Sequence, residues 1–311
     1  MLRFYFYCFC FLILVSCSKN SNNDNQYLKG KNVLTTKIDG DNRQYIVQLP
    51  SNYDPKNKYP AVMMLHGSSG NGEKFWNISG WKEVGDTANI ITVYPSSWEY
   101  CIIETNGTLK TTKWNASGSF GYCPGEVPRD DEKFFSVIID EITTKFSVDP
   151  KRIYLVGFSN GGSMASKCMV TMSDKFAAIC SNAGSLKSDT VYNHKRKIPF
   201  LLQVGNEDDN IITLNNNQPL PMNFNQVYKI ADIQASITTI LNSLGLGNSF
   251  SVSGDPNNVI TASYNSTSGI PDNVFLYRIV KGLKHQYPNG SNHPMYGAAE
   301  QWNWMKNYKL P

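Results

Sequence analysis

The residues best suited to chemistry lie in one pentapeptide, Gly157-Phe-Ser-Asn-Gly, which fits the pattern G-x-S-x-G. The apolar run 153–156 before it predicts a strand, and the segment 163–170 after it predicts a helix. A serine on a sharp strand-to-helix turn is strained and exposed, and the glycines leave room for neighbouring backbone. This context favours Ser159 as a nucleophile, whereas the pentapeptide alone also fits a glycine-rich turn with an ordinary serine.

A serine hydroxyl at neutral pH needs a base, a group that orients the base, and donors for a developing oxyanion. For a serine on such a turn, the acid and then the histidine follow in the chain. Glu207, Asp208 and Asp209 stand in a row after the predicted strand 199–204. Asp208 is the preferred acid, with Asp209 and then Glu207 as alternatives. The two acids that do not take part in catalysis would be ordinary residues of a solvated acidic turn.

His285 is the candidate base, because it lies directly after the last predicted strand and completes the order serine, acid, histidine. The other histidines fit less well. His66 and His194 precede the acid in the chain, and His293 stands before a proline at the start of the last predicted helix. There His293 could merely cap or pack.

His66 instead opens the loop His66-Gly67-Ser68 after a central predicted strand. A loop at this place supplies one oxyanion donor, and the residue after the nucleophile supplies the other. We therefore expect the backbone N–H groups of Ser68 and Asn160 to form the oxyanion site, and His66 to brace the loop.

These residues need a scaffold, and strands alternate with helices along the chain. The predicted strands are 44–50, 59–65, 89–94, 153–156, 176–181, 199–204 and 274–280. The predicted helices are 131–146, 163–170, 227–244 and 296–308. Such alternation predicts a single α/β domain, with a mostly parallel central sheet and helices on both faces. The candidate residues fall at the carboxyl ends of strands, where such sheets bind ligands. Segments 98–130 and 248–272 read as insertions.

The pattern at the N-terminus is typical of a targeting segment. Arg3 precedes an apolar run, 4–15, that is too short to span a bilayer comfortably. The run ends in Leu-Val-Ser-Cys17, which resembles a bacterial lipobox, with an ordinary secretory signal as the alternative. We expect a signal peptide at 1–16, lipidation of Cys17, a polar tether at 17–30 and a catalytic domain at 31–311. The expected location is the outer membrane, facing the periplasm or the cell surface, with the lipid anchor as the only membrane contact.

Four of the seven cysteines remain after the leader and Cys17 are set aside, namely Cys101, Cys123, Cys168 and Cys180. An even number in an exported protein allows disulfides, with three connectivities. Pairs 101–123 and 168–180 are one possibility, and buried free thiols are the other. No C-x-x-C pair or His/Cys cluster indicates a metal, and the chemistry above needs no cofactor.

Several motifs together resemble those of the polyhydroxybutyrate depolymerase and feruloyl esterase family. They are 65–73 (LHGSSGNGE), 148–154 (VDPKRIY), 157–162 (GFSNGG) and 176–178 (FAA). The resemblance is specific over about residues 39–184 and weaker through 205–208 and 282–288. It implies an exported α/β-hydrolase fold with Ser159 as nucleophile. The family's G-x-x-D turn falls on Gly205 and Asp208, and its histidine, aromatic and proline fall on His285, Tyr287 and Pro288. Tyr287 stands where many members have tryptophan.

Substrate and partners follow less directly from the sequence. A net charge of +4 spread without a basic block gives no indication of nucleic-acid binding. Aromatic residues in predicted rim loops, such as Trp76, Trp114 and Tyr287, could bind a sugar or a feruloyl ring, or simply pack. We expect a monomeric serine esterase that acts on feruloyl or acetyl esters of xylan-type polysaccharides. The alternatives are a polyhydroxyalkanoate depolymerase, a serine peptidase, and a non-catalytic glycan-binding lipoprotein.

Overall fold

The computed structural model describes residues 27–116, 121–186, 194–266 and 273–311. The predicted signal peptide, Cys17 and most of the predicted tether lie outside the described residues. Within these ranges, no helix combines the length and the apolar character needed to cross a bilayer.

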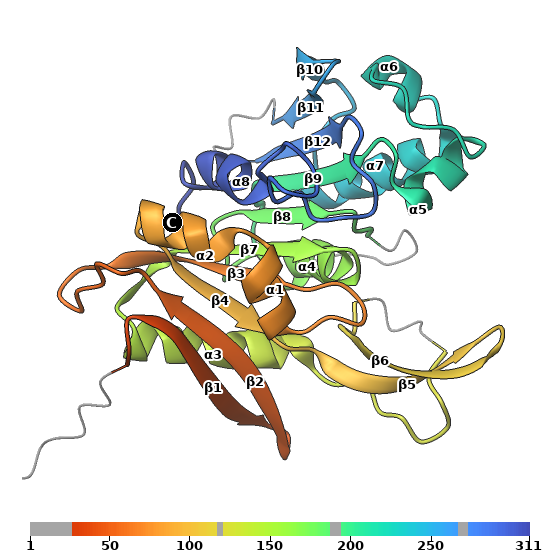
Figure 1. Cartoon of the computed structure of the whole chain (residues 1–311). Coiled ribbons are helices and arrows are strands. Elements are labelled where there is room, and N and C mark those ends of the chain that lie inside the picture. Colours follow the sequence, from red (N-terminus) through yellow and green to blue (C-terminus); the bar gives the residue numbers. More distant parts are fainter. Residues whose placement is uncertain (1–26, 117–120, 187–193, 267–272) are drawn as a thin grey trace, which may run out of the picture.

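A single large sheet organises the described part of the chain, with ten strands in the order β1-β2-β4-β3-β7-β8-β9-β12-β11-β10 (Figure 1). The six central strands run parallel to one another. They are β4 (Ile91–Pro95), β3 (Tyr59–Leu65), β7 (Val148–Phe158), β8 (Ile179–Asn182), β9 (Phe200–Gly205) and β12 (Val274–Val280). Every residue of β3, β4, β8 and β9 is buried, as expected for strands covered on both faces.

Antiparallel strands extend the sheet at both edges. At one edge, β1 (Gly30–Ile38) pairs with β2 (Asp41–Leu49), which pairs in turn with β4. At the other edge, β10 (Ser251–Asp255) pairs with β11 (Val259–Asn265), which pairs with β12. The predicted insertion 248–272 therefore forms, over its described residues, an extension of the main sheet.

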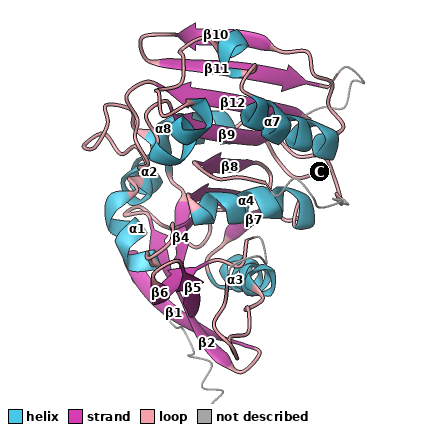
Figure 2. Cartoon of the chain, turned by 90° about the vertical axis from the view of Figure 1, so that its right-hand side faces the viewer, coloured by secondary structure: helices cyan, strands magenta, loops and turns pink. Residues whose placement is uncertain are grey.

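Helices cover both faces of the sheet, which confirms the predicted fold class (Figure 2). One face packs against α3 (Asp131–Lys145), α4 (Asn160–Thr171), α6 (Phe224–Val227) and α7 (Ala231–Leu244). The other packs against α1 (Gly72–Ile78), α2 (Trp81–Ala88) and α8 (Gly297–Met305). Two short elements, α5 (Asp209–Ile212) and η1 (Thr213–Asn215), follow β9.

The predicted insertion 98–130 carries a separate hairpin, β5 (Trp98–Glu104) with β6 (Gly107–Lys113), which projects beside the sheet. A disulfide joins Cys101 of β5 to Cys123, as one of the proposed pairs requires. The second proposed pair is wrong, because Cys168 and Cys180 are buried free thiols. Cys168 belongs to the core on the α4 face of the sheet, whereas Cys180 belongs to the core on the opposite face.

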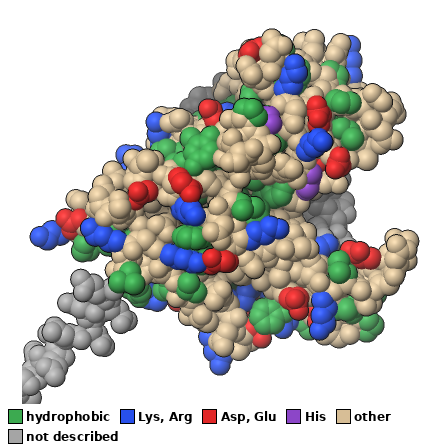
Figure 3. Space-filling view, viewed as in Figure 1, with side chains coloured by type: hydrophobic (Ala, Val, Ile, Leu, Met, Phe, Trp, Pro, Cys, Tyr) green, Lys and Arg blue, Asp and Glu red, His purple; other side chains and the backbone are tan. Residues whose placement is uncertain are grey.

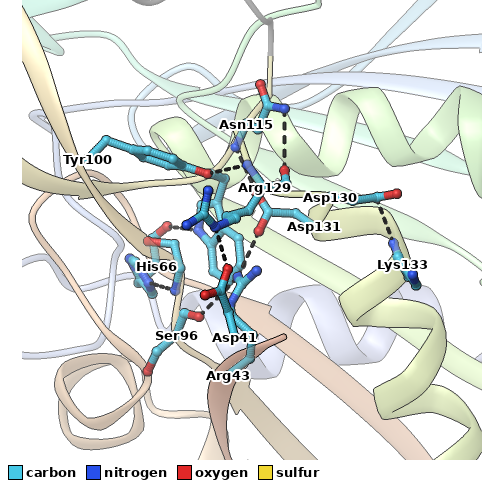
Figure 4. Close-up of polar contacts among 12 residues, drawn as sticks. Asp41, Arg43, His66, Ser96, Tyr100, Asn115, Arg129, Asp130, Asp131 and Lys133 are labelled. Atoms are coloured by element: carbon cyan, nitrogen blue, oxygen red, sulfur yellow. Dashed lines mark hydrogen bonds and ion pairs between the residues drawn. The ribbon is translucent and has the colours of Figure 1, made fainter. Parts of the chain in front are cut away.

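A buried ion pair fixes the base of this insertion to the sheet (Figure 4). Arg43 of β2 contacts Asp131 at the start of α3 with an N···O distance of 2.7 Å, and both side chains are almost fully buried. The other carboxylate oxygen of Asp131 accepts a hydrogen bond from the backbone N–H of Asn115 at 2.7 Å. Removing one partner of such a buried pair leaves an uncompensated charge, which costs about 3–5 kcal/mol. The hydrogen bond from Asn115 to Asp131 fixes the backbone at Asn115. It therefore also helps to fix the neighbouring residue, Trp114.

Candidate active site

Ser159 occupies a strained turn between β7 and α4. Its backbone has φ 54° and ψ −121°, and it caps the N-terminus of α4. A Cβ on Gly157 would lie 2.0 Å from the carbonyl oxygen of Gly161, and one on Gly161 would lie 2.4 Å from that of His66. Both glycines are therefore needed for the strand and the helix to meet at this angle. The turn places the Ser159 side chain at the positive end of the α4 dipole.

The structure brings the three residues proposed from the sequence together. His285 Nε2 lies 2.9 Å from Ser159 Oγ, and His285 Nδ1 lies 2.8 Å from Asp208 Oδ2. Asp208 can only accept when ionised, so the neutral imidazole carries its proton on Nδ1 and leaves Nε2 to accept from the serine. This is the arrangement that allows a histidine to take the proton of a serine hydroxyl.

Asp208 stands apart from the two acids beside it in the sequence. Its side chain is fully buried, whereas Asp209 is exposed and Glu207 is partly exposed. The second carboxylate oxygen of Asp208 accepts the backbone N–H of Asn210 at 2.9 Å, which fixes the carboxylate at the start of α5. Burial and this bond fit the acid that orients the base.

The turn with Asp208 and the loop with His285 are held against each other by contacts that the sequence reasoning missed. A Cβ on Gly205 would lie 1.9 Å from the carbonyl oxygen of Leu283, so only glycine permits this approach. Asn206 is nearly buried, and its Oδ1 accepts the backbone N–H of Gly282 at 2.6 Å. The G-x-x-D pattern marks the glycine, but nothing in the sequence distinguishes Asn206 from the other asparagines.

The two segments expected to supply oxyanion donors lie beside the nucleophile. A Cβ on Gly67 would lie 3.1 Å from the Cβ of Ser159, which places the backbone of the 66–68 loop against the serine. Asn160 is the first residue of α4, and its side chain makes two bonds to the backbone of Trp114. Its Oδ1 accepts the Trp114 N–H at 2.7 Å, and its Nδ2 donates to the Trp114 carbonyl at 3.1 Å. This clamp was not predicted.

His66 is buried, and its two ring nitrogens are both engaged by the backbone. Nε2 accepts the N–H of Ser97 at 3.0 Å, so Nδ1 carries the proton and donates to the Gly67 carbonyl at 2.7 Å. Burial lowers the pKa of His66 to about 4. A neutral histidine with both nitrogens occupied braces the loop, as expected from the sequence.

This environment makes the stability of the fold depend on pH. The unfolded chain protonates His66 near pH 6.5, whereas the folded protein resists protonation until about pH 4. The stabilisation is therefore complete above pH 6.5 and is lost as the pH falls toward 4. Between pH 7 and pH 4.5 the free energy of unfolding should fall in both proteins. We expect the fall to be about 2 kcal/mol smaller in His66→Gln than in the wild type. Urea unfolding at both pH values measures this difference, and equal losses in the two proteins would refute it.

The structure does not support two of the three aromatic residues proposed to bind substrate. Trp114 is fully buried and donates from Nε1 to the His66 carbonyl at 2.8 Å. Tyr287 is 3% exposed and lies between Trp81, which donates to its hydroxyl, and Gln301, which accepts from it. Neither ring offers a surface to a ligand, so both assignments are wrong. Trp76 is partly exposed, but the ammonium groups of Lys31 and Lys82 lie 4.3 and 4.0 Å from its ring centroid.

The parallel sheet, the strained serine after β7 and the Ser159–His285–Asp208 contacts define an α/β-hydrolase fold with the site of a serine hydrolase. Residues 36–305 match the family described as "Putative esterase", which is most of the chain. The protein belongs to this esterase family.

Three curated relatives illustrate the range of the family. The chain is 26% identical over 279 residues to feruloyl esterase B of Piromyces equi, covering 86% of this chain and 46% of that protein. It is 27% identical over 172 residues to the bifunctional acetylxylan esterase/xylanase XynS20E of Neocallimastix patriciarum, covering 55% and 22%. It is 29% identical over 145 residues to poly(3-hydroxyalkanoate) depolymerase C of Paucimonas lemoignei, covering 46% and 31%. The chain thus spans less than half the length of each of these relatives.

Solved structures share the fold at low identity. An acetyl xylan esterase from Aspergillus awamori superimposes with a TM-score of 0.58 at 13% identity, covering 88% of this chain and 99% of that one. The poly(3-hydroxybutyrate) depolymerase LpqC from Bordetella parapertussis superimposes with a TM-score of 0.55 at 15% identity, covering 91% and 92%. At such identities the likeness concerns the fold.

Proposed function

We propose that this esterase works through an acyl-enzyme formed on Ser159. His285 Nε2 takes the proton of Ser159 Oγ as the oxygen attacks the ester carbonyl, and then gives it to the departing alcohol. Water, deprotonated by the same nitrogen, releases the acid and restores the serine. Asp208 orients the imidazole and stabilises its charged form. The continuous contacts from Ser159 Oγ through His285 to Asp208, at 2.9 and 2.8 Å, carry this proposal.

The backbone N–H groups of Ser68 and Asn160 are the proposed oxyanion donors. The position of Gly67 against Ser159 and of Asn160 at the start of α4 supports the assignment. One such donor typically contributes on the order of 3 kcal/mol to transition-state stabilisation. Because the donors are backbone groups, the side chain of Asn160 is left to bind the backbone of Trp114.

The proposed substrates are feruloyl or acetyl esters carried by xylan-type plant polysaccharides. Relatives named feruloyl esterase and acetylxylan esterase support this class, and the feruloyl esterase matches over most of this chain. The relative named as a poly(3-hydroxyalkanoate) depolymerase supports hydrolysis of a polyester as the second candidate. Both reactions use the same residues and differ only in the ester that is bound.

A panel of three polymers separates the candidates. Purified protein is incubated with feruloylated arabinoxylan, acetylated xylan and polyhydroxybutyrate, and the released ferulate, acetate and hydroxybutyrate are quantified. We expect ferulate or acetate release, abolished in Ser159→Ala. Release of hydroxybutyrate alone would replace the polysaccharide proposal with the polyester one.

We further propose that residues 31–311 act as a catalytic domain outside the cytoplasm, held to the outer membrane through a lipidated Cys17. The Cys101–Cys123 disulfide supports an oxidising compartment, where such bonds persist. Mass spectrometry of the protein extracted from membranes tests the anchor, since an N-terminal Cys17 must carry the mass of its acyl chains. An unmodified N-terminus would refute the anchor.

A further inference from the structure

A cavity of about 740 Å³ lies beside the catalytic histidine's loop and has no part in the mechanism above. Its walls come from the β10–β11 hairpin, the end of β12, the segment 292–295 and α8. Figure 1 shows the β10–β11 hairpin extending the sheet beyond β12. The residues that give the cavity its chemistry are Asn257, Thr261, Arg278, Lys281 and Glu300.

Arg278 of β12 is the deepest charged group in this wall. Its Nε and Nη1 atoms are buried and have no hydrogen-bond partner among the described residues. Burial lowers the pKa of Arg278, and the charge of Glu300 opposes this with a smaller effect. The guanidinium is therefore a partly buried cation with no ion pair in the described part of the chain, a state that costs free energy until an anion pairs with it.

The other groups that line the cavity do not pair with the charge of Arg278. Glu300 is exposed, and among the described residues no ion pair joins it to Arg278. Lys281, also exposed, adds a second positive charge at the rim. His293 lines the cavity, but it donates from Nε2 to the Lys281 carbonyl at 2.8 Å and accepts the Met295 N–H at 3.0 Å. On the view in Figure 3, charges of both signs are interspersed over the rest of the surface.

The cavity is linked to the site through the chain itself. Gly282 lines the cavity, and His285 follows three residues later on the same loop. Gly282 is also the residue whose N–H is held by Asn206, next to the turn that carries Asp208. A group bound here would thus lie near the carboxyl end of β12, the end of the strand that leads into the His285 loop.

We propose that this cavity binds the carboxylate of an acidic saccharide, with Arg278 as its charge partner. Guanidinium groups suit carboxylates because their fixed planar donors match the two oxygens. Thr261 and Asn257 offer a hydroxyl and an amide to sugar hydroxyls. The assignment deepens the proposed function, on which its role in catalysis rests: uronic-acid side groups of a polysaccharide would be held here while a nearby ester is cleaved.

Direct binding tests the cavity without any catalysis. Sodium glucuronate, glucose and inorganic phosphate are titrated calorimetrically into the wild type, Arg278→Gln, Glu300→Gln and, as an exposed charge-loss control, Lys306→Gln. We expect glucuronate to bind the wild type and Lys306→Gln equally, Arg278→Gln at least tenfold more weakly, and Glu300→Gln more tightly. Glucuronate affinity unchanged in both Arg278→Gln and Glu300→Gln would overturn the proposal. Phosphate bound as tightly as glucuronate would overturn the saccharide assignment.

Kinetics then test the link to catalysis. We expect a several-fold lower KM for acetylated glucuronoxylan than for acetylated neutral xylan, and loss of that difference in Arg278→Gln. The kcat of Arg278→Gln on p-nitrophenyl acetate should stay unchanged, which shows that the variant is folded. Equal KM values for the two polymers in the wild type would contradict the role in catalysis. Binding of glucuronate without hydrolysis of any polysaccharide ester would leave the cavity assigned and refute the proposed function.

Discussion

Replacing Ser159 with alanine is expected to lower kcat on p-nitrophenyl acetate by at least four orders of magnitude. The variant loses the oxygen that lies 2.9 Å from His285 Nε2, so no acyl-enzyme can form. Loss of a catalytic serine elsewhere costs on the order of 10⁶-fold in kcat, and the activity that remains comes from the oxyanion donors and from binding. Steady-state rates measured with protein freed of other esterases give this ratio.

Ser163→Ala is the matched control for that experiment. Ser163 lies one turn further along α4, and its Oγ accepts the backbone N–H of Ser185 rather than contacting His285. The control should retain nearly full activity. A Ser159→Ala protein that keeps more than about a tenth of the wild-type kcat would show that another residue is the nucleophile.

Asp208→Asn is expected to lower kcat by about 10⁴-fold. The amide is nearly isosteric, so the fold should persist, but its NH₂ group can face His285 Nδ1 and favour the tautomer that carries the proton on Nε2. That tautomer cannot accept the proton of Ser159. Asp208 is fully buried, and its Oδ2 lies 2.8 Å from Nδ1, so the substitution acts directly on the proton of the imidazole.

Asp209→Asn and Glu207→Gln separate this effect from a general loss of negative charge. Asp209 is exposed and Glu207 partly exposed, so neither change should lower kcat by more than about twofold. If Asp209→Asn lowered kcat as much as Asp208→Asn, the assignment of Asp208 as the residue that orients His285 would be wrong.

The elements that position the site could be predicted because they are buried on both faces. The apolar runs at 59–65 and 274–280 coincide with β3 and β12, and the glycine pattern locates the start of α4. The strands β1, β6 and β10 carry no such run, and the short apolar run 100–103 of β5 lies in a hairpin outside the main sheet. The helix predicted at 227–244 is interrupted, because α6 ends at Val227 and Ile230 is extended before α7 begins.

The three proposed catalytic residues follow from chain order, whereas their surroundings depend on contacts that no spacing reveals. Trp114 and Tyr287 are aromatic residues of loops, and only their burial shows that they pack. The clamp of Asn160 on the Trp114 backbone joins residues 46 positions apart. Cys168 and Cys180 are close in sequence but lie on opposite faces of the sheet, a difference that strand geometry decides.

Labelling with a fluorophosphonate probe tests the central claim most directly, because only an activated serine reacts with it rapidly. Intact mass should show one adduct per chain, and peptide mapping should place that adduct on Ser159. Asp208→Asn should react far more slowly, and Ser159→Ala should not react. A wild-type protein that hydrolyses esters while carrying the adduct elsewhere, or no adduct, would contradict the assignment of Ser159 as the nucleophile.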